Sequence, residues 1–342
     1  MAQAWSVVSA VTSYPIRSPR WVLTYQGEDI TADISHMVVA ISYRDVLGGR
    51  SGEMSVTLED REQRWQGPWR PSEGTVVKLL LGYGGEKLLE AGDFQVDELE
   101  LSGPPDVMQM RCLAAYITPA LRTRQSAGYE NRTLLDVAAQ IALKHGMELI
   151  GAPVFPNVLF RRVTQNRETD LGFLRRLART HDYDFTVRGR QLIFYSRREL
   201  EARAAVATVR RREVESFRFK AGSYRTYVAA EVAYLNSEMK ALVAHNAAAA
   251  TAVATGDSYK LVTRVEDAQQ AALKAAAALH DMNMEQTTAV IGLPGATALS
   301  AGNNVELAGF GSMDGKYLIE TATHRLQRRT GYTTEIMARR VD

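Results

Sequence analysis

An approximate internal repeat near the two ends of this 342-residue chain limits the folds it can adopt. Residues 74–96 and residues 302–319 show the same order of glycines, aromatic residues and apolar residues, and a strand-like segment follows each copy. The repeated anchors are Gly74, Val77, Leu79, Gly82-Tyr83-Gly84, Gly92–Val96 and Met108–Leu113, matched by Gly302, Val305, Leu307, Gly309-Phe310-Gly311, Gly315–Ile319 and Tyr332–Met337. Alternation with a period of two indicates strands, so the sequence predicts two β units with a shared strand order.

Residues 1–115 carry strand signals throughout. Gly52–Asp60 alternates apolar and polar residues as a half-buried strand does, and glycine-rich turns at 82–85 and 103–106 separate further alternating segments. Short strands with regular turns and no intervening helix are typical of a closed barrel or a sandwich. We therefore expect residues 1–115 to form a first antiparallel β-barrel.

Residues 116–204 change to a helical period and predict an α+β insert. Thr133 is a good N-cap with Asp136 three residues later, and Gly146 stands where a left-handed residue would end that helix. A second helix follows the N-cap Thr169, and a hairpin is expected to turn at 188–190. The second helix carries one apolar stripe made of Phe173, Leu174, Leu177 and Ala178.

The β pattern returns at 216–234, so residues 205–235 and 285–342 are expected to form a second antiparallel barrel. Residues 236–284 interrupt it with two alanine-rich blocks, 241–254 and 268–278. Alanine is the best helix former, so the second block predicts a helix that begins near Glu266 and Asp267. The first block fits either a helix or an irregular excursion. The predicted apolar face of the helix is Val265, Ala268, Ala272, Ala275, Ala276 and Leu279.

Length and charge narrow the functional class. A chain of 342 residues exceeds the usual size of one core, so several domains are expected. Lys and Arg number 41 against 39 Asp and Glu, a net charge of +2, whereas a protein that grips nucleic acid is more strongly basic. The single cysteine, Cys112, excludes an internal disulfide framework and fits a reducing cytoplasm. No segment has the length of a membrane span or the pattern of a signal peptide, so we expect no membrane insertion by this chain itself.

No pattern of catalytic, cofactor-binding or metal-binding residues is found. The six histidines (His36, His145, His181, His245, His280 and His324) never occur at metal-ligand spacing. Gly82–Gly85 lacks the lysine and helix of a phosphate loop and predicts a hairpin turn. The carboxylate pairs Glu168 with Asp170 and Glu98 with Glu100 could serve as acid and base in glycan cleavage, but such groups are more often capping or solvated. We expect a protein that is not an enzyme.

Arginine runs are the remaining charged feature. They are Arg197-Arg198, Arg210-Arg211-Arg212, Arg328-Arg329 and Arg339-Arg340. Nucleic-acid binding is one interpretation, but no aromatic residues interleave with the arginines, and Glu199, Glu201, Glu213 and Glu215 lie nearby as ion-pair partners. Because arginine is enriched in protein interfaces, we favour subunit contacts for these runs.

The segment from Gln165 to Ala178 carries a family resemblance. It runs from Gln165 through Thr169-Asp170 to the stripe at 173–178, and a hairpin at 184–195 follows. This segment resembles the late-control D family of phage tails, the baseplate hub proteins related to the N-terminal part of the type VI secretion spike protein VgrG. His181-Asp182 stands where relatives tend to carry a glycine, so the helix end is expected to close differently.

The resemblance implies a particular architecture and role. Hub proteins of this family have two tube-like barrels, an α/β insert between them and a further insert in the second, and their trimer forms a pseudo-six-fold ring. Two similar units in each of three chains let a three-fold object meet a six-fold one. Because the sequence stops at Asp342 without a glycine-patterned β-helix, the puncturing tip is expected to be another polypeptide.

These observations predict a structural hub of a contractile phage tail or a phage-derived injection particle. It would be a homotrimer that adapts the six-fold tail tube to the three-fold spike and leaves a lumen for DNA or other cargo. Its expected partners are the spike, the tail tube or tube-initiator protein and other baseplate proteins, in the virion tail after assembly in the host cytoplasm. The alternatives are a tail-associated peptidoglycan hydrolase or peptidase and, third, a nucleic-acid-binding protein.

Overall fold

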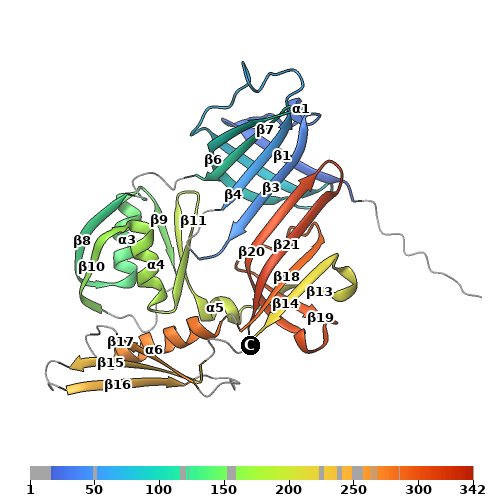
Figure 1. Ribbon diagram of the computed structural model, residues 1–342. Helices are drawn as coiled ribbons and strands as arrows, with labels where there is room; N and C mark the ends of the chain where they lie inside the picture. The colour runs from blue at the N-terminus through green and yellow to red at the C-terminus, as the bar shows by residue number, and fades with distance from the viewer. Residues whose placement is uncertain are drawn as a thin grey trace, which may run out of the picture.

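The computed structural model describes residues 17–48, 52–115, 121, 123–151, 159–222, 227–236, 241–248, 257–262, 265, 268–284 and 286–341. Most of its regular structure is strand, arranged in one large sheet and three small ones (Figure 1). The expected fold class, mainly β with α+β inserts, is confirmed. No helix in these ranges has the length and apolarity needed to cross a membrane.

The first β unit packs antiparallel strands around one apolar core. Its elements are β1 (Pro19–Tyr25), β2 (Glu28–Asp29), α1 (Thr31–Ile34), β3 (Val38–Val46), β4 (Glu53–Glu59), β5 (Val76–Tyr83), β6 (Leu89–Ser102) and β7 (Val107–Ala114). The strands are hydrogen-bonded in the order β3-β4-β7-β6-β5-β1-β2. Alternation places Met54, Val56 and Leu58 of β4 in the core while their neighbours face outwards.

The α+β insert has a core of its own. Its elements are β8 (Arg124–Thr133), α3 (Leu134–Lys144), β9 (Glu148–Gly151), β10 (Leu159–Thr169), α4 (Asp170–Arg179), β11 (Tyr183–Arg188), β12 (Gln191–Ser196) and α5 (Arg197–Ala202). Both predicted helix starts are confirmed, because Thr133 forms a capping box with Asp136 and Thr169 accepts from the backbone N–H of Gly172. Gly146 ends α3 with a φ of 64°. The stripe Phe173, Leu174, Leu177 and Ala178 is buried as predicted.

The second β unit is built from β13 (Ala205–Arg210), β14 (Ser216–Ala221), β18 (Thr287–Pro294), β19 (Asn304–Ala308), β20 (Gly315–Gln327) and β21 (Gly331–Arg340). It carries a third hydrophobic core, centred on residues such as Ile291, Val305, Tyr317 and Ile336. The hydrogen-bonded order is β13-β19-β20-β21-β18-β14.

The two β units share a strand order. Six strands of each unit are hydrogen-bonded in the same order. In chain order, the strands of the first unit and their counterparts in the second are β1, β3, β4, β5, β6 and β7, and β13, β14, β18, β19, β20 and β21. The match extends to single hydrogen bonds: the N–H of Gly74 donates to Val96 at 2.7 Å, and that of Gly302 donates to Ile319 at 2.8 Å. A register shift follows the same position in both long strands, after Val96 and after Ile319. The repeat inferred from the sequence is therefore present in the backbone.

One pairing departs from the expected antiparallel barrels. Strand β1 runs antiparallel to β5, whereas β13 runs parallel to β19. The chain leaves the α+β insert through α5 and starts β13 beside the start of β19. By contrast, β1 starts beside the end of β5. The shared order thus holds for all six strands, while the direction of the first strand is reversed.

The second insert is partly β, which corrects two expectations. Strand β15 (Ala229–Asn236) pairs with β16 (Ala241–Ala248) and β17 (Ser258–Val262) in a separate sheet, so it lies outside the second β unit. The first alanine-rich block is thus strand over 241–248, because Val243 and Ala247 alternate onto the face that packs against the insert core. The remainder of that block, 249–254, and the strand expected at 223–226 lie outside the described residues.

Helix α6 (Ala268–Asn283) confirms a helix in the second alanine-rich block. Its predicted start at 266–267 lies outside the described residues. The predicted face is confirmed in part: Ala275 and Leu279 are buried, but Ala271 is buried as well, and Ala268 and Ala272 are exposed. Alanine gives a weak hydrophobic stripe, so packing against β15 and β16 decides which face is covered.

Strands β3 and β20 join the two units into one 13-stranded sheet. They run antiparallel from Val46 opposite Thr321 to Ala40 opposite Gln327. Figure 1 shows β3 of the first unit beside β20 and β21 of the second, with the α+β insert and the α6 insert to one side. We call this β3–β20 pairing the seam.

Candidate functional site: the polar face of the shared sheet

Eight strands of the large sheet form one continuous path, β14-β18-β21-β20-β3-β4-β7-β6. One face of this path covers the two β-unit cores, since the buried residues of each strand alternate towards them. The opposite face carries the intervening residues, which are mostly polar. Near the seam it is hollowed into a groove of about 250 Å³ lined by Ser42, Arg44, Glu53, Met54, Ser55, Thr321, Thr323, Arg325, Glu335 and Met337.

Charges on the polar face are mixed and locally paired. Arg111 of β7 lies 2.8 Å from Glu98 of β6, and Arg325 of β20 lies 3.5 Å from Glu335 of β21. Arg44 and Glu53 sit on paired positions of β3 and β4. Exposed pairs of this kind contribute little stability, but they keep the local net charge near zero.

The seam is stabilised by a buried histidine. The ring of His324 stacks on Tyr43 across the seam at 5.9 Å between centroids. Its Nε2 lies 3.1 Å from the carbonyl of Leu299 and its Nδ1 lies 2.9 Å from the hydroxyl of Tyr332. Burial disfavours the charged imidazolium and lowers the pKa of His324 to about 4, despite the hydrogen bond to the Leu299 carbonyl. The ring is thus neutral near pH 7, with Nε2 donating and Nδ1 accepting.

An arginine from the β20–β21 turn forms hydrogen bonds and an ion pair beyond the Ala40–Gln327 end of the seam. The guanidinium of Arg328 donates to the backbone carbonyls of Val38 at 3.1 Å and His36 at 2.8 Å, and it pairs with Glu59 at 2.6 Å. Its planar fork satisfies carbonyls that strand pairing leaves open. This arginine was expected at a subunit contact, and within one chain it joins the two β units.

The near end of the seam meets the α+β insert at Asp45. This carboxylate accepts from the backbone N–H of Ala301 at 3.1 Å and from Arg188 of the insert at 3.3 Å. Burial raises the pKa of Asp45, and Arg188 and the N–H donors act against that rise. One acidic side chain thereby links both β units to the insert.

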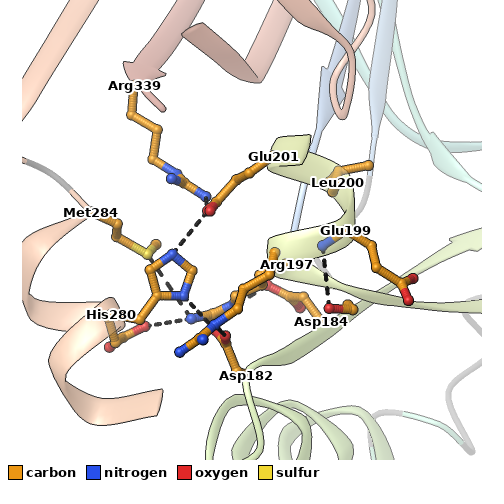
Figure 2. Close-up of polar contacts among 12 residues, drawn as sticks. Asp182, Asp184, Arg197, Glu199, Leu200, Glu201, His280, Met284 and Arg339 are labelled. Carbon is orange, nitrogen blue, oxygen red and sulfur yellow. Dashed lines mark hydrogen bonds and ion pairs between the residues drawn. The ribbon is translucent and has the colours of Figure 1, made fainter. Parts of the chain in front are cut away.

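A second polar cluster locks helix α6 against α5 and β21 (Figure 2). His280 of α6 lies between Asp182 at 2.6 Å and Glu201 at 3.0 Å, and Arg339 of β21 reaches Glu201 at 2.5 Å. Burial alone would lower the pKa of His280, but the hydrogen bonds to the two carboxylates outweigh it and raise the pKa to about 9. Burial likewise opposes ionisation of Glu201, while His280 and Arg339 lower its pKa to about 2. At neutral pH His280 and Glu201 are therefore both charged. We call His280, Asp182, Glu201 and Arg339 the His280 cluster.

Beside it, Arg197 joins the insert to α6 (Figure 2). Its side chain is 4% exposed and lies 2.8 Å from Asp281 and 3.7 Å from Asp184. Arg197 and Arg339 were expected at subunit contacts, and that expectation is wrong for both, because both are buried within the chain. A buried arginine needs carboxylate partners to offset the loss of hydration, and these partners come from distant segments.

The other candidates from the sequence have structural partners. Asp170 is buried at the start of α4 between His145 at 2.7 Å and Gln165 at 2.9 Å; burial opposes its ionisation, but these hydrogen bonds lower its pKa. Glu168 pairs with Arg176 at 3.0 Å. Gly82–Gly85 closes the β5–β6 hairpin, as predicted. Among the described residues no group of His, Cys, Asp or Glu could hold a metal ion.

The sequence missed the His280 cluster as a unit. Its members were noted separately: His280 among the histidines, Asp182 at an unusual helix end, and Glu201 and Arg339 as charges near or within arginine runs. No local spacing relates them, because they come from α4's C-terminal end, α5, α6 and β21.

Comparison with known proteins finds sequence relatives among phage baseplate hub proteins. The chain is 28% identical over 177 residues to the probable baseplate hub protein of Escherichia phage 186, which is 52% of this chain and 45% of that protein. The match thus spans less than half the length of this relative. No family model matches the chain.

Solved structures share the fold over almost the whole chain. A 43 kDa tail protein of prophage MuSo2 from Shewanella oneidensis has a TM-score of 0.73 and 14% identity, covering 94% of this chain and 98% of that one. The Escherichia coli protein c3393, described as a component of the type VI secretion system, has a TM-score of 0.61 and 14% identity, covering 94% and 77%. The resemblance to phage baseplate hub proteins is therefore confirmed: the chain is similar to one in sequence and has the fold of phage tail and type VI secretion proteins.

Proposed function

We propose that this chain is a structural baseplate hub of a contractile tail and acts as a homotrimer. The observation that carries the proposal is the pair of β units with one strand order, joined by the seam into a continuous sheet. Three such chains around an axis present six similar units, which matches a six-fold ring on one side and a three-fold object on the other. The sequence similarity to a probable baseplate hub protein of phage 186 supports this role.

The polar face of the shared sheet would form the wall of the lumen. If the two β-unit cores face outwards around the ring, this face points to the axis. Arg44, Arg111 and Arg325 are balanced on it by Glu53, Glu98 and Glu335. A balanced wall suits a passage for DNA, because a strongly cationic wall would hold the phosphates and slow their release.

The partners would be a tail tube or tube-initiator protein on one side and a spike on the other. The Escherichia coli protein c3393, which shares the fold, is described as a component of the type VI secretion system with structural similarity to phage T4 tail proteins. We assign this chain to the virion tail, assembled in the host cytoplasm, with a mechanical role and no catalytic one. The inserts and the His280 cluster would hold the outer surface rigid during sheath contraction.

Native mass spectrometry of the full chain, alone and with its spike, tests the proposal. A trimer in either sample, with a pseudo-six-fold ring in electron-microscopy class averages, is the expected result. A monomer in both samples would refute the hub role. Measurable cleavage of peptidoglycan by that monomer would move the assignment to the enzyme alternative, and salt-sensitive DNA binding would move it to the third.

A further inference from the structure

The seam provides a template for a second strand pairing. Within one chain, β3 of the first unit adds to β20 of the second through seven residue pairs, from Val46–Thr321 to Ala40–Gln327. In the strand order of the repeat, β3 corresponds to β14, and β20 corresponds to β6. If the second β unit of one copy met the first β unit of the next copy in the same way, β14 would pair with β6.

The residue correspondence follows from the pairings inside each unit. Phe94 and Tyr317 both precede the register shift in the long strand and pair with the ends of β7 and β21. On that basis Glu100 corresponds to Thr323, and Leu101 to His324. In the same way Phe219 corresponds to Tyr43 and Lys220 to Arg44, through their partners on β18 and β4.

Both strands have an open edge in the described structure. Beyond Val96, strand β6 is paired on its β7 side alone among the described strands. The β20 edge that corresponds to this stretch is the one that receives β3. Strand β14 ends the eight-strand path and pairs with β18 but with no other described strand. Open edges of this kind are available for addition of another strand.

We propose that β14 of one copy of this chain pairs antiparallel with residues 98–102 of β6 in the next copy. This interface rests on the proposed trimer and specifies how it closes. Transfer of the seam register places Leu99 opposite Ala221, Glu100 opposite Lys220, Leu101 opposite Phe219 and Ser102 opposite Arg218. The partner is a second copy of the chain, and three such contacts close the ring.

The chemistry of the two edges is complementary in this register. On the core face, Leu101 is 48% exposed, and Phe217, which would lie diagonally across from it, is 44% exposed, so pairing would bring two large apolar side chains together. Leu101 would meet Phe219 where His324 stacks on Tyr43 in the seam. On the polar face, the acidic Glu100 of β6 would lie directly opposite the basic Lys220 of β14. Glu98 would lie diagonally across from Lys220, and Arg218 diagonally across from Glu100.

The same two edges cannot meet within one chain. They are the first and last strands of the eight-strand path, and neighbouring strands are spaced about 4.8 Å apart, so the edges are separated by on the order of 30 Å. Figure 1 places β14 at the lower right and β6 at the upper left of the shared sheet. A bond between them is therefore a bond between copies.

Charge reversal tests the register. Glu100→Lys and Lys220→Glu each place like charges opposite one another at all three interfaces. If each interface loses roughly fivefold in affinity, the affinity of trimer formation should fall on the order of a hundredfold. The double variant restores opposite charges and should recover the trimer in sedimentation of the full chain. Recovery distinguishes a lost contact from a misfolded chain. Both residues are exposed, and if each substitution impaired folding, the two defects would add up in the double variant, whereas charge repulsion is relieved by it.

Cysteine pairs provide a covalent readout. Glu100→Cys with Lys220→Cys joins facing positions, and mild oxidation should give a covalent trimer on a denaturing gel. The matched control, Glu100→Cys with Phe219→Cys, is one residue out of register and places the sulfurs on opposite faces, so it should remain uncross-linked. The native Cys112 is buried and 1% exposed, so it should not contribute.

The outcomes separate this interface from the hub role itself. A trimer that persists in both single charge variants and gives no cross-link would refute the β14–β6 pairing while leaving the hub role intact. A parent chain that stays monomeric with its spike and gives no cross-link would refute both. A covalent trimer from the facing pair alone, with rescue by the double charge reversal, would establish the pairing.

Discussion

His280 should stabilise the packing of α6 by an amount that depends strongly on pH. Its pKa rises from an ordinary 6.5 to about 9 in the folded chain, because Asp182 and Glu201 hold the charged ring. A raised pKa gives stability that is fully present below the unfolded value and is lost as pH rises through about 9. The linkage amounts to about 3 kcal/mol at pH 6, about 2 kcal/mol at pH 7.5 and nearly zero at pH 10.

The perturbation is His280→Gln, which keeps a polar side chain and removes the titrating charge. Urea unfolding followed by circular dichroism at these three pH values should show a stability loss that shrinks as pH rises. The side chain of His280 is 19% exposed, so solvent screening takes away little of this effect. The control is His36→Gln, which replaces an exposed histidine outside the His280 cluster and leaves the cluster intact. An equal loss at pH 6 and pH 10 would refute the claim that charge pairing holds the cluster.

Three further predictions concern stability and reactivity. Leu177→Asp buries an unpaired carboxylate in the α4 stripe and should cost about 3–5 kcal/mol in urea unfolding, whereas Arg176→Ala on the exposed side should cost under about 1 kcal/mol; equal values would contradict burial of the stripe. Because burial lowers the pKa of His324 to about 4, stability should fall as pH drops from about 6.5 towards 4, and His324→Gln should flatten that part of the urea-midpoint profile; an unchanged slope would argue against a neutral ring in the seam. Burial raises the pKa of Cys112 to about 12, so a thiol reagent at pH 8 should label it only after urea unfolding, and rapid labelling of the folded chain would show that the first core is open.

Local features of this fold could be predicted from the sequence. The caps at Thr133 and Thr169 act on backbone groups two or three residues away, so a short window contains all the necessary information. The same is true of the α4 stripe, whose members recur at helical spacing. The internal repeat was detectable because glycines and alternating residues mark turns and strands wherever they occur.

The alanine-rich segment shows where local propensity fails. Alanine favours helix by up to about 0.7 kcal/mol over most residues, and packing within a sheet outweighs that preference. Residues 241–248 therefore became strand β16, while residues 268–283 became helix α6 with a buried face that matches the predicted one only in part. In both segments tertiary contacts determine the outcome: β16 pairs with β15, and α6 packs against both strands.

Local sequence was sufficient to specify the two helix caps, the α4 stripe and the repeated strand order. Which strand edges meet and which charges are buried depend on the tertiary structure: β3 pairs with β20, Arg328 donates to the carbonyls of His36 and Val38, and His280 pairs with Asp182 and Glu201. The reason is physical. A cap or a periodic stripe is fixed by neighbours in the chain, whereas edge pairing and buried ion pairs depend on groups that only the folded chain brings together.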